Sequence, residues 1–546
     1  MEKIERKKGG LMKSFLKRLL KRISHQNHGK SSAFSTSGQT KTSTNQKNEA
    51  PLSQRATVGY LKKELANCSD IIYHDFSVAQ TACTIIYING MVDVRLLQDN
   101  VLNPLTSFPE SADSKDLLKH LFDESALPVN KQKQISTPED ALTGVLDGQV
   151  LLIVDGSEKK LLIGLSSPVK RGIEKPDTET VIRGPREAFV ESLDDNLVLL
   201  RKRLKLSTFK TEEMIIGTES KTKVVLVYIE GKNNDKLVKE MRYRLSSIEI
   251  NSVFGSSYLE EFIEDNPMSP FSQLQYTERP DTVCASLLEG RVAVIVDGSP
   301  ITIMAPVTLF MLMQSAEDYY TRFWYATWIR WVRFVFLLLS LLLPSFYIAV
   351  TTFHPEIIPE DLLLTVASAR EVVPFPAVLE AVIMELFFEA LREAAVRIPQ
   401  AIGQAVSIIG ALIIGTAAVQ AGIASPVMVI IVSLTGISSF ITPHYDLGLS
   451  FRMLRFPIMI LAASFGLVGV AIAMLLIYIH LLELKSFGYP YLSPLAPMIR
   501  KDLKDTLVRA PWWAMGVRPI FKLTNSKAGR RLQGRKWDKP AEDKDE

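Results

Sequence analysis

The chain has 546 residues, which is too long for a single hydrophobic core and predicts two to four structural units. Its overall composition is ordinary, with 47% hydrophobic residues, 22% charged residues and a formal net charge of +4. This average conceals a sharp division, since residues 334–482 are overwhelmingly apolar. Such a region excludes a wholly soluble protein and indicates an integral membrane protein whose soluble part comes first.

Residues 1–50 are predicted to form a basic, largely disordered tail, because they contain 12 Lys or Arg against 3 Asp or Glu. Between Leu11 and Ile23, apolar residues recur at helical spacing with Lys and Arg among them. This segment is either a basic amphipathic helix on an anionic lipid surface or a solvated charged tail. The charges interrupt it too often for a signal peptide.

An internal repeat follows the tail. Residues 147–156 (DGQVLLIVDG) reappear as residues 289–298 (EGRVAVIVDG), at an offset of 142. Residues 83–90 parallel residues 224–231 at an offset of 141. Nearly constant offsets over several elements predict two related α/β subdomains, in which strands alternate with helices.

We place these α/β subdomains at residues 51–180 and 218–310, with a linking helix region at 181–217. Within the linking region, apolar residues recur at helical spacing, with acidic residues early and basic residues late. This helix either packs the two halves together or couples subunits to each other.

A helical transmembrane domain is expected at residues 320–482. Residues 334–351 carry no charge and are long enough to cross a hydrocarbon core of about 30 Å. Three Trp and three Arg precede this segment, as at the cytoplasmic end of a membrane span, and the loop after it is acidic. The α/β part is therefore predicted to be cytoplasmic.

Three further segments are apolar, at residues 406–424, 426–442 and 458–482. Arg452 and Arg455 suggest that residues 443–456 form a cytoplasmic loop, and the basic tail at 483–546 suits the same side. Two cytoplasmic ends need an even number of crossings, but five candidate segments are present. We therefore expect four to five membrane segments.

The remaining candidate, residues 378–399 (VLEAVIMELFFEALREAAVRIP), carries charges at membrane depth. Three interpretations are open: a structural helix with intrahelical ion pairs, a helix on the membrane surface, or an aqueous pathway lined by several copies. At 100° per residue, Glu385, Glu389 and Arg392 fall within a stripe of about 60°. Because charges at this depth face water or partners rather than lipid, the stripe is the candidate functional site.

Catalytic and cofactor motifs are absent from the sequence: it has no Walker A loop, GxGxxG, HExxH, GxSxG or CxxC pair where a fold would use one. The spacing of Cys68, Cys83 and Cys284 argues against a disulfide framework or a metal site. His444 is either a satisfied structural residue or a proton or ligand site. An anionic membrane explains the basic ends without a nucleic acid. We expect neither an enzyme nor a bound cofactor.

Several longer motifs resemble the A subunit of the GerA family of spore germinant receptors. The resemblance extends over about residues 55–520. Its motifs are Gly184-Pro-Arg-Glu-Ala-Phe189, Pro374-Phe-Pro376, the charged segment from Glu380 to Pro399, and Pro443-His-Tyr-Asp446. A related spore membrane protein, the SpoVAF-type paralogue, shares much of this pattern, whereas the long polar basic tail favours a receptor subunit.

The resemblance implies a multi-pass protein of the inner spore membrane that acts with a transporter-like B subunit and a lipoprotein C subunit. Together they would sense nutrients and start germination, with the A subunits assembled as an oligomeric, nutrient-gated cation channel. The alternative is a non-conducting scaffold that couples the sensing subunits to downstream germination proteins.

In the channel interpretation, the charged helix would line the pore with Val378, Glu385, Glu389, Arg392, Glu393 and Val396. Glu385 and Glu389 would attract cations, and Arg392 would pair with them or gate them. The two valines would form apolar constrictions.

Overall fold

The computed structural model describes residues 54–109, 114–123, 127–129, 131–165, 176, 178–397, 415–500 and 502–515. These residues all belong to one compact unit, 51–546. The basic tail at 1–50, residues 406–414 of the predicted segment 406–424 and the chain after residue 515 lie outside the described residues.

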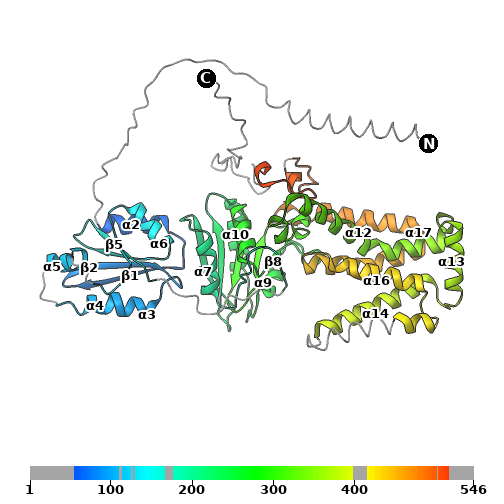
Figure 1. Ribbon diagram of the computed structural model, residues 1–546, viewed down its shortest axis with the longest axis horizontal. Coiled ribbons are helices and arrows are strands. Elements are labelled where there is room, and N and C mark those ends of the chain that lie inside the picture. The colour runs from blue at the N-terminus through cyan, green and yellow to red at the C-terminus, as the bar shows by residue number, and fades with distance from the viewer. Residues whose placement is uncertain are drawn as a thin grey trace, which may run out of the picture. The chain divides into compact units, whose positions relative to one another are not determined.

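Two five-stranded antiparallel sheets form the α/β part (Figure 1). The first has the order β1-β2-β4-β5-β3, with β1 (Ile71–Val78), β2 (Thr81–Ile88), β3 (Gln132–Ile135), β4 (Val150–Val154) and β5 (Lys160–Ile163). The second has the order β6-β7-β9-β10-β8, with β6 (Phe209–Ile216), β7 (Thr222–Ile229), β8 (Gln275–Thr277), β9 (Val292–Val296) and β10 (Thr302–Ala305). The orders correspond strand for strand, so the repeat in the sequence is also a repeat in topology.

Helices cover both faces of each sheet, which is why the central strands read as continuous apolar runs. On the first sheet, α2 (Gln54–Glu64) and α6 (Pro138–Leu146) lie opposite a series of short helices. That series is α3 (Val94–Leu97), η1 (Gln98–Leu102), α4 (Asn103–Thr106), α5 (Ser114–Leu118) and η2 (Lys119–Asp123). On the second sheet, α7 (Leu193–Arg203) and α10 (Pro280–Leu288) lie opposite α8 (Asp235–Ser246) and α9 (Ser256–Ile263).

Helix α7 joins the two sheets. It packs on the second sheet, while Arg201 near its end binds Asp70 beside the first sheet, with Nε–Oδ2 and Nη2–Oδ1 distances of 2.7 and 2.9 Å. Strand β6 lies within the region 181–217, so the second sheet begins before the predicted boundary at residue 218. Its half-polar sequence, FKTEEMII, does not read as a buried strand because β6 is an edge strand.

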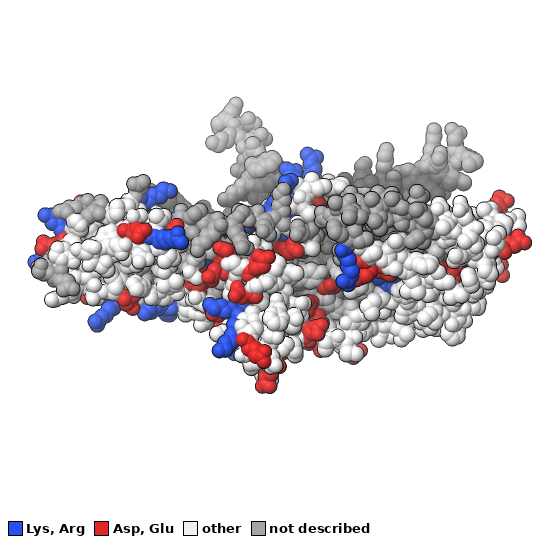
Figure 2. All heavy atoms as spheres, turned by 90° about the horizontal axis from the view of Figure 1, so that it is seen from below, with Lys and Arg blue, Asp and Glu red and all other residues white. Residues whose placement is uncertain are grey.

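Residues 323–483 form what we call the helical block. Its helices are α12 (Phe323–Phe353), η4 (Pro355–Ile357), α13 (Glu360–Glu371), α14 (Ala377–Arg397), α16 (Pro426–Phe440) and α17 (Tyr445–Glu483). Among the described residues, α12 and α17 are long and apolar enough to cross a membrane, and α16 is a shorter apolar helix. Four to five separate spans are therefore not confirmed. The face in Figure 2 shows charged side chains gathered mainly over the α/β part.

Helix α17 reverses direction at Gly466, where φ is +63°. A Cβ atom on Gly469 would lie 2.1 Å from the Leu461 carbonyl oxygen. In a continuous helix these two residues, eight positions apart, would be separated by about 12 Å along the axis, so the chain must turn back between them. Both ends of α17 contact the α/β part: His444 at its start lies 3.2 Å from Gln275, and His480 lies 2.8 Å from Ser269. Residues 458–482, counted as one candidate membrane segment, are therefore not a single straight helix, because the reversal lies within them.

The chain returns to the α/β part after α17. The hairpin β11 (Lys485–Ser486) and β12 (Tyr489–Pro490) precedes the short helices η5 (Asp502–Asp505) and η6 (Trp512–Ala514). Ser486 Oγ donates a hydrogen bond to Gln273 O at 2.6 Å and accepts one from Val307 N at 3.0 Å. Between the second sheet and α12 lie α11 (Leu309–Leu312) and η3 (Ala316–Tyr319).

Candidate functional site in the helical block

Helix α14 carries the charged stripe, and the chain on either side fixes its start. Pro374 and Pro376 precede the helix, and the Glu380 carboxylate accepts hydrogen bonds from the backbone N–H and the hydroxyl of Ser425, both at 2.6 Å. Ser425 is the N-cap of α16, so Glu380 places a negative charge at the positive end of that helix. This contact ties the start of α14 to the start of α16.

One turn later, Glu385 forms an ion pair with Arg455 of α17, and both side chains are buried. Arg455 Nε also donates to the Ser340 carbonyl of α12 at 2.8 Å. That carbonyl lacks its helical partner because residue 344 is a proline, which has no N–H to donate. Arg455 therefore neutralises a carboxylate on one helix and satisfies a free carbonyl on another.

A second cluster surrounds Glu389. Arg392, one turn along the same helix, lies 3.2 Å from its carboxylate, and Arg452 of α17 lies 3.3 Å away. Arg392 also donates to Ser439 Oγ at 2.5 Å and lies over the ring of Phe440 at 4.4 Å. These contacts connect α14 with the end of α16 and the start of α17.

The six predicted residues lie in different environments. Val378 is partly buried against neighbouring helices, and the side chain of Glu385 has no exposed area. The side chain of Glu389 is 30% exposed and that of Glu393 is 64% exposed, the latter pairing with Arg397 at 2.6 Å. The three carboxylates are therefore progressively more exposed along α14, whereas the side chain of Arg392, between Glu389 and Glu393, is only 9% exposed. The side chain of Val396 lies outside the described residues.

Arg452 and Arg455 are the functional candidates that the sequence analysis misplaced. They were expected in a cytoplasmic loop at 443–456, whereas the structure has them inside α17, both buried. A charge can be buried here because each arginine meets a carboxylate of α14. The three-residue spacing of the arginines, matched by the four-residue spacing of Glu385 and Glu389, is the signal that could have identified the pairing.

The two intrahelical ion pairs of the structural interpretation are both present, at Glu389–Arg392 and Glu393–Arg397. Some hydrogen-bonding capacity remains unused: Glu385 Oε1 and Arg455 Nη2 are buried and have no partner in the described structure. The Glu385–Arg455 pair is thus incompletely satisfied, which leaves each group able to accept a new partner.

His444 lies at the start of α17, outside the charged clusters. It is buried, and its Nε2 is 3.2 Å from the Gln275 side chain. Burial and the nearby Arg291 lower the pKa of His444 to about 4, so the ring is neutral at pH 7. The described residues contain no group of three or more His, Cys, Asp and Glu that could hold a metal ion.

Residues 59–521 match the family described as Bacillus/Clostridium GerA spore germination protein. The chain is 46% identical over 476 residues to an uncharacterized membrane protein of Bacillus subtilis strain 168, YfkQ, with 84% of this chain and 90% of that protein covered. It is 42% identical over 461 residues to spore germination protein KA of the same organism, with 84% of each chain covered.

Among solved structures, the chain is similar to the N-terminal domain of the A subunit of the Bacillus megaterium spore germinant receptor GerK3. The identity is 33% and the TM-score is 0.37, with 46% of this chain and 94% of that domain covered.

Proposed function

This chain belongs to the GerA family of spore germination proteins, and we propose from that premise that it is the A subunit of a nutrient receptor that triggers germination. It would lie in the inner membrane of the spore, with its α/β part in the cytoplasm. Its partners would be a transporter-like B subunit, a lipoprotein C subunit and further copies of itself. Relatives named as spore germination proteins, at 35–42% identity, support the role in germination.

Within that receptor, the chain would act as a nutrient-gated cation channel. The observation that supports this role is the position of four carboxylates on α14, at every fourth or fifth residue, in a block that is predominantly apolar. Glu389 and Glu393 are partly or largely exposed in the single chain, so several copies around an axis could present them to an ion path. Val378, Glu385, Arg392 and Val396 would complete the lining.

The buried ion pair suggests how such a path would be closed. While Arg455 holds Glu385 and the Ser340 carbonyl, this carboxylate is unavailable to a cation. Opening would require Arg455 to release Glu385, and the unused hydrogen-bonding atoms of both side chains would lower the cost of that exchange. Glu385 would then act as a gated part of the lining.

Glu389→Gln and Glu393→Gln provide the test, with Glu371→Gln on α13 as an exposed control of the same chemistry. Removing carboxylates from the path should slow the nutrient-triggered release of monovalent cations from spores, by about tenfold if each ring supplies about 1.4 kcal/mol of attraction. The control should release ions normally. Unchanged release and selectivity, with the receptor complex intact, would remove both carboxylates from the path.

A scaffold that conducts no ions is the second candidate, because every charge on α14 except Glu380 already has an ion partner within 3.3 Å in a single chain. Reconstituted receptor decides between the two. Conductance that responds to nutrients supports the channel, whereas partner binding without any conductance supports the scaffold.

A further inference from the structure

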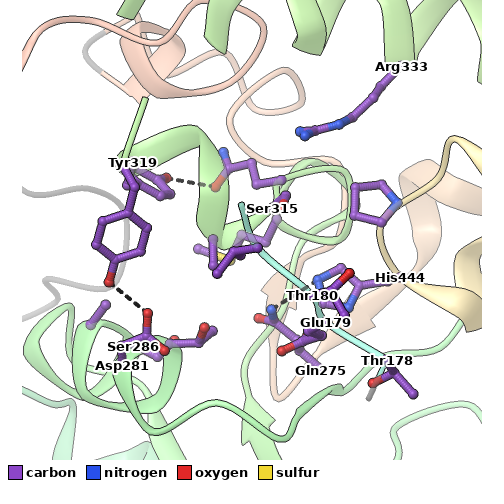
Figure 3. A pocket seen from close by; sticks show the side chains of 18 of the residues that line it. Thr178, Glu179, Thr180, Gln275, Asp281, Ser286, Ser315, Tyr319, Arg333 and His444 are labelled. Atoms are coloured by element: carbon purple, nitrogen blue, oxygen red, sulfur yellow. Dashed lines mark hydrogen bonds between the residues drawn. The ribbon is translucent and has the colours of Figure 1, made fainter. Parts of the chain in front are cut away.

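A cavity of about 500 Å³ lies where the second sheet meets the helical block (Figure 3). Its walls come from β8, α10, η3, the start of α12, the turn between α16 and α17, and the C-terminal segment. Figure 3 shows Glu179, Arg333 and His444 reaching it from three different parts of the chain. This volume falls in the range of small-molecule sites.

Arg291, at the start of β9, is the unusual group in the wall. It is buried, and no carboxylate forms an ion pair with it in the described part of the chain. Its Nη1 donates to Gln275 Oε1 at 2.7 Å and to Ser286 Oγ at 3.1 Å, while its Nε has no partner. Burial lowers the pKa of Arg291 to about 10, while the nearby Glu289 carboxylate acts in the opposite direction, so Arg291 still carries its charge at pH 7. A buried cation without a counterion is costly unless an anion compensates it.

Apart from Glu289, which acts on Arg291 electrostatically without forming an ion pair with it, the other charged groups of the wall are already paired or weakly charged. Arg333 binds Asp318 at 2.7 Å. Asp281 binds Arg279 at 2.9 Å and accepts a hydrogen bond from Tyr320 at 2.7 Å. Burial raises the pKa of Glu179 to about 7, so this carboxyl carries only part of a negative charge at neutral pH. Arg291 is therefore the cation of this wall that forms no ion pair in the described part of the chain.

We propose that this cavity binds a small organic anion, with a carboxylate or phosphate group held at Arg291. The guanidinium suits both groups, because its N–H donors match two oxygens of one anion. Phe440, Tyr319 and Trp512 supply aromatic wall, which favours a ligand with a flat apolar body. The source of the anion is either a soluble molecule or the headgroup of an anionic lipid.

The first α/β subdomain supplies an internal comparison. By the offset of 142, Arg291 corresponds to Gln149 and Gln275 corresponds to Lys133. The repeated fold therefore does not require an arginine at this place, which argues against a purely structural reason for it.

The cavity also contacts the candidate site of the helical block. Phe440 lines the cavity and lies 4.4 Å from the Arg392 guanidinium, which in turn binds Glu389. An anion in the cavity would thus touch a residue that packs on the charged stripe. The site itself would exist whether or not the chain conducts ions, since Arg291 takes no part in the proposed path.

The test measures binding to the full-length chain, purified in a phosphate-free detergent at constant ionic strength. Benzoate and inorganic phosphate are the soluble probes and phosphatidylglycerol is the lipid probe, each titrated while the thermal unfolding midpoint is followed. We expect at least one probe to raise the midpoint saturably. Arg291→Gln should weaken that probe about 10- to 100-fold, the range for a charge-assisted hydrogen-bonded contact.

Arg242→Gln is the matched control, because Arg242 pairs with Glu212 away from the cavity. The affinity of this variant for the probe should equal that of wild type. Ala285→Trp keeps the proposal testable if Arg291→Gln does not fold: Ala285 is exposed and lines the cavity, so a large side chain there should block binding without disturbing the core. Saturation by a soluble probe or by the lipid alone identifies the source. No saturable binding by any probe, or equal affinity in wild type and both cavity variants, overturns the proposal.

Discussion

The α/β part and the helical block each bury an ion pair, and the two pairs differ in how completely they are satisfied. Asp70 and Arg201 form two parallel hydrogen bonds, Asp70 accepts a third from Thr211 at 2.8 Å, and Arg201 lies over Phe209 at 4.5 Å. Glu385 and Arg455 share one contact and leave an oxygen and a nitrogen unused. The first pair is suited to hold two subdomains together, and the second is suited to exchange partners.

The largest effect is expected in the α/β part. Arg201→Gln leaves the Asp70 carboxylate buried without its counterion, which should cost about 3–5 kcal/mol of unfolding free energy. Arg203→Gln, two residues further along α7, removes a partly exposed pair with Glu187 and should cost less than about 1 kcal/mol. Unfolding of the full chain in detergent measures both. A small loss of unfolding free energy for Arg201→Gln would show that this ion pair does not hold the two subdomains together, contrary to its geometry.

A smaller loss is expected in the helical block. Arg455→Gln removes the partner of Glu385, but Arg392 and Arg452 remain in the neighbouring cluster around Glu389, so we expect a loss of about 2 kcal/mol. The double variant Glu385→Gln with Arg455→Gln should recover most of this loss, because no charge is left unpaired. The same stability assay applies. Nutrient-triggered ion release is a second readout, and it should become faster in Arg455→Gln. If Arg455→Gln costs as much as Arg201→Gln, the distinction between the two pairs disappears.

The boundary between the two regions should respond to pH. Burial, with Asp446 of α17 and Glu264 nearby, raises the pKa of Glu260 to about 7. The folded chain then holds a proton that the unfolded chain releases near pH 4.5, so stability should fall by about 1 kcal/mol, after discount for partial exposure, as pH rises from about 4.5 to 7. Glu260→Gln should flatten this window. An unchanged slope in that variant would assign the dependence to other carboxyls.

The smallest change in stability is expected from Pro344→Ala in α12. The new N–H would bond the Ser340 carbonyl and compete with Arg455 for it, so the net change should stay below about 1 kcal/mol. Arg455 would then lose its hydrogen bond to the Ser340 carbonyl and keep only Glu385. Because Arg455 would be held less firmly, ion release should require less nutrient. Ser345→Ala, at a neighbouring buried hydroxyl with no hydrogen-bond partner among the described residues, is the control and should release ions as wild type does. If Pro344→Ala and Ser345→Ala change ion release in the same way, the cause would be a general packing effect.

Much of the fold could be predicted from local patterns. The repeat at offsets of 141 and 142 corresponds to two sheets of equal strand order, and the apolar segments correspond to the helical block. The edge strand β6 was not predicted, because polar residues at its exposed positions interrupt the apolar run expected of a buried strand. The reversal at Gly466 was missed because a glycine within an apolar run is also compatible with a straight membrane helix.

The candidate site could be predicted only in part. The charges of α14 were visible as a helical stripe, since residues three and four apart share a face. Their partners were not, because Glu385 and Arg455 are 70 positions apart and an arginine at the end of an apolar segment usually marks a membrane boundary. The Pro344–Ser340–Arg455 arrangement was out of reach for the same reason.

By itself, the sequence determined that the chain has a repeated α/β part, an apolar helical part and one charged helix within it. These properties follow from periodicity and composition, which local segments carry alone. Only the tertiary structure decided which arginines neutralise α14, where α17 turns back, and that Arg291 lines a cavity without an ion pair to any described residue. Ion pairs and cavities depend on contacts between distant segments, whose geometry the pattern along a single chain does not contain.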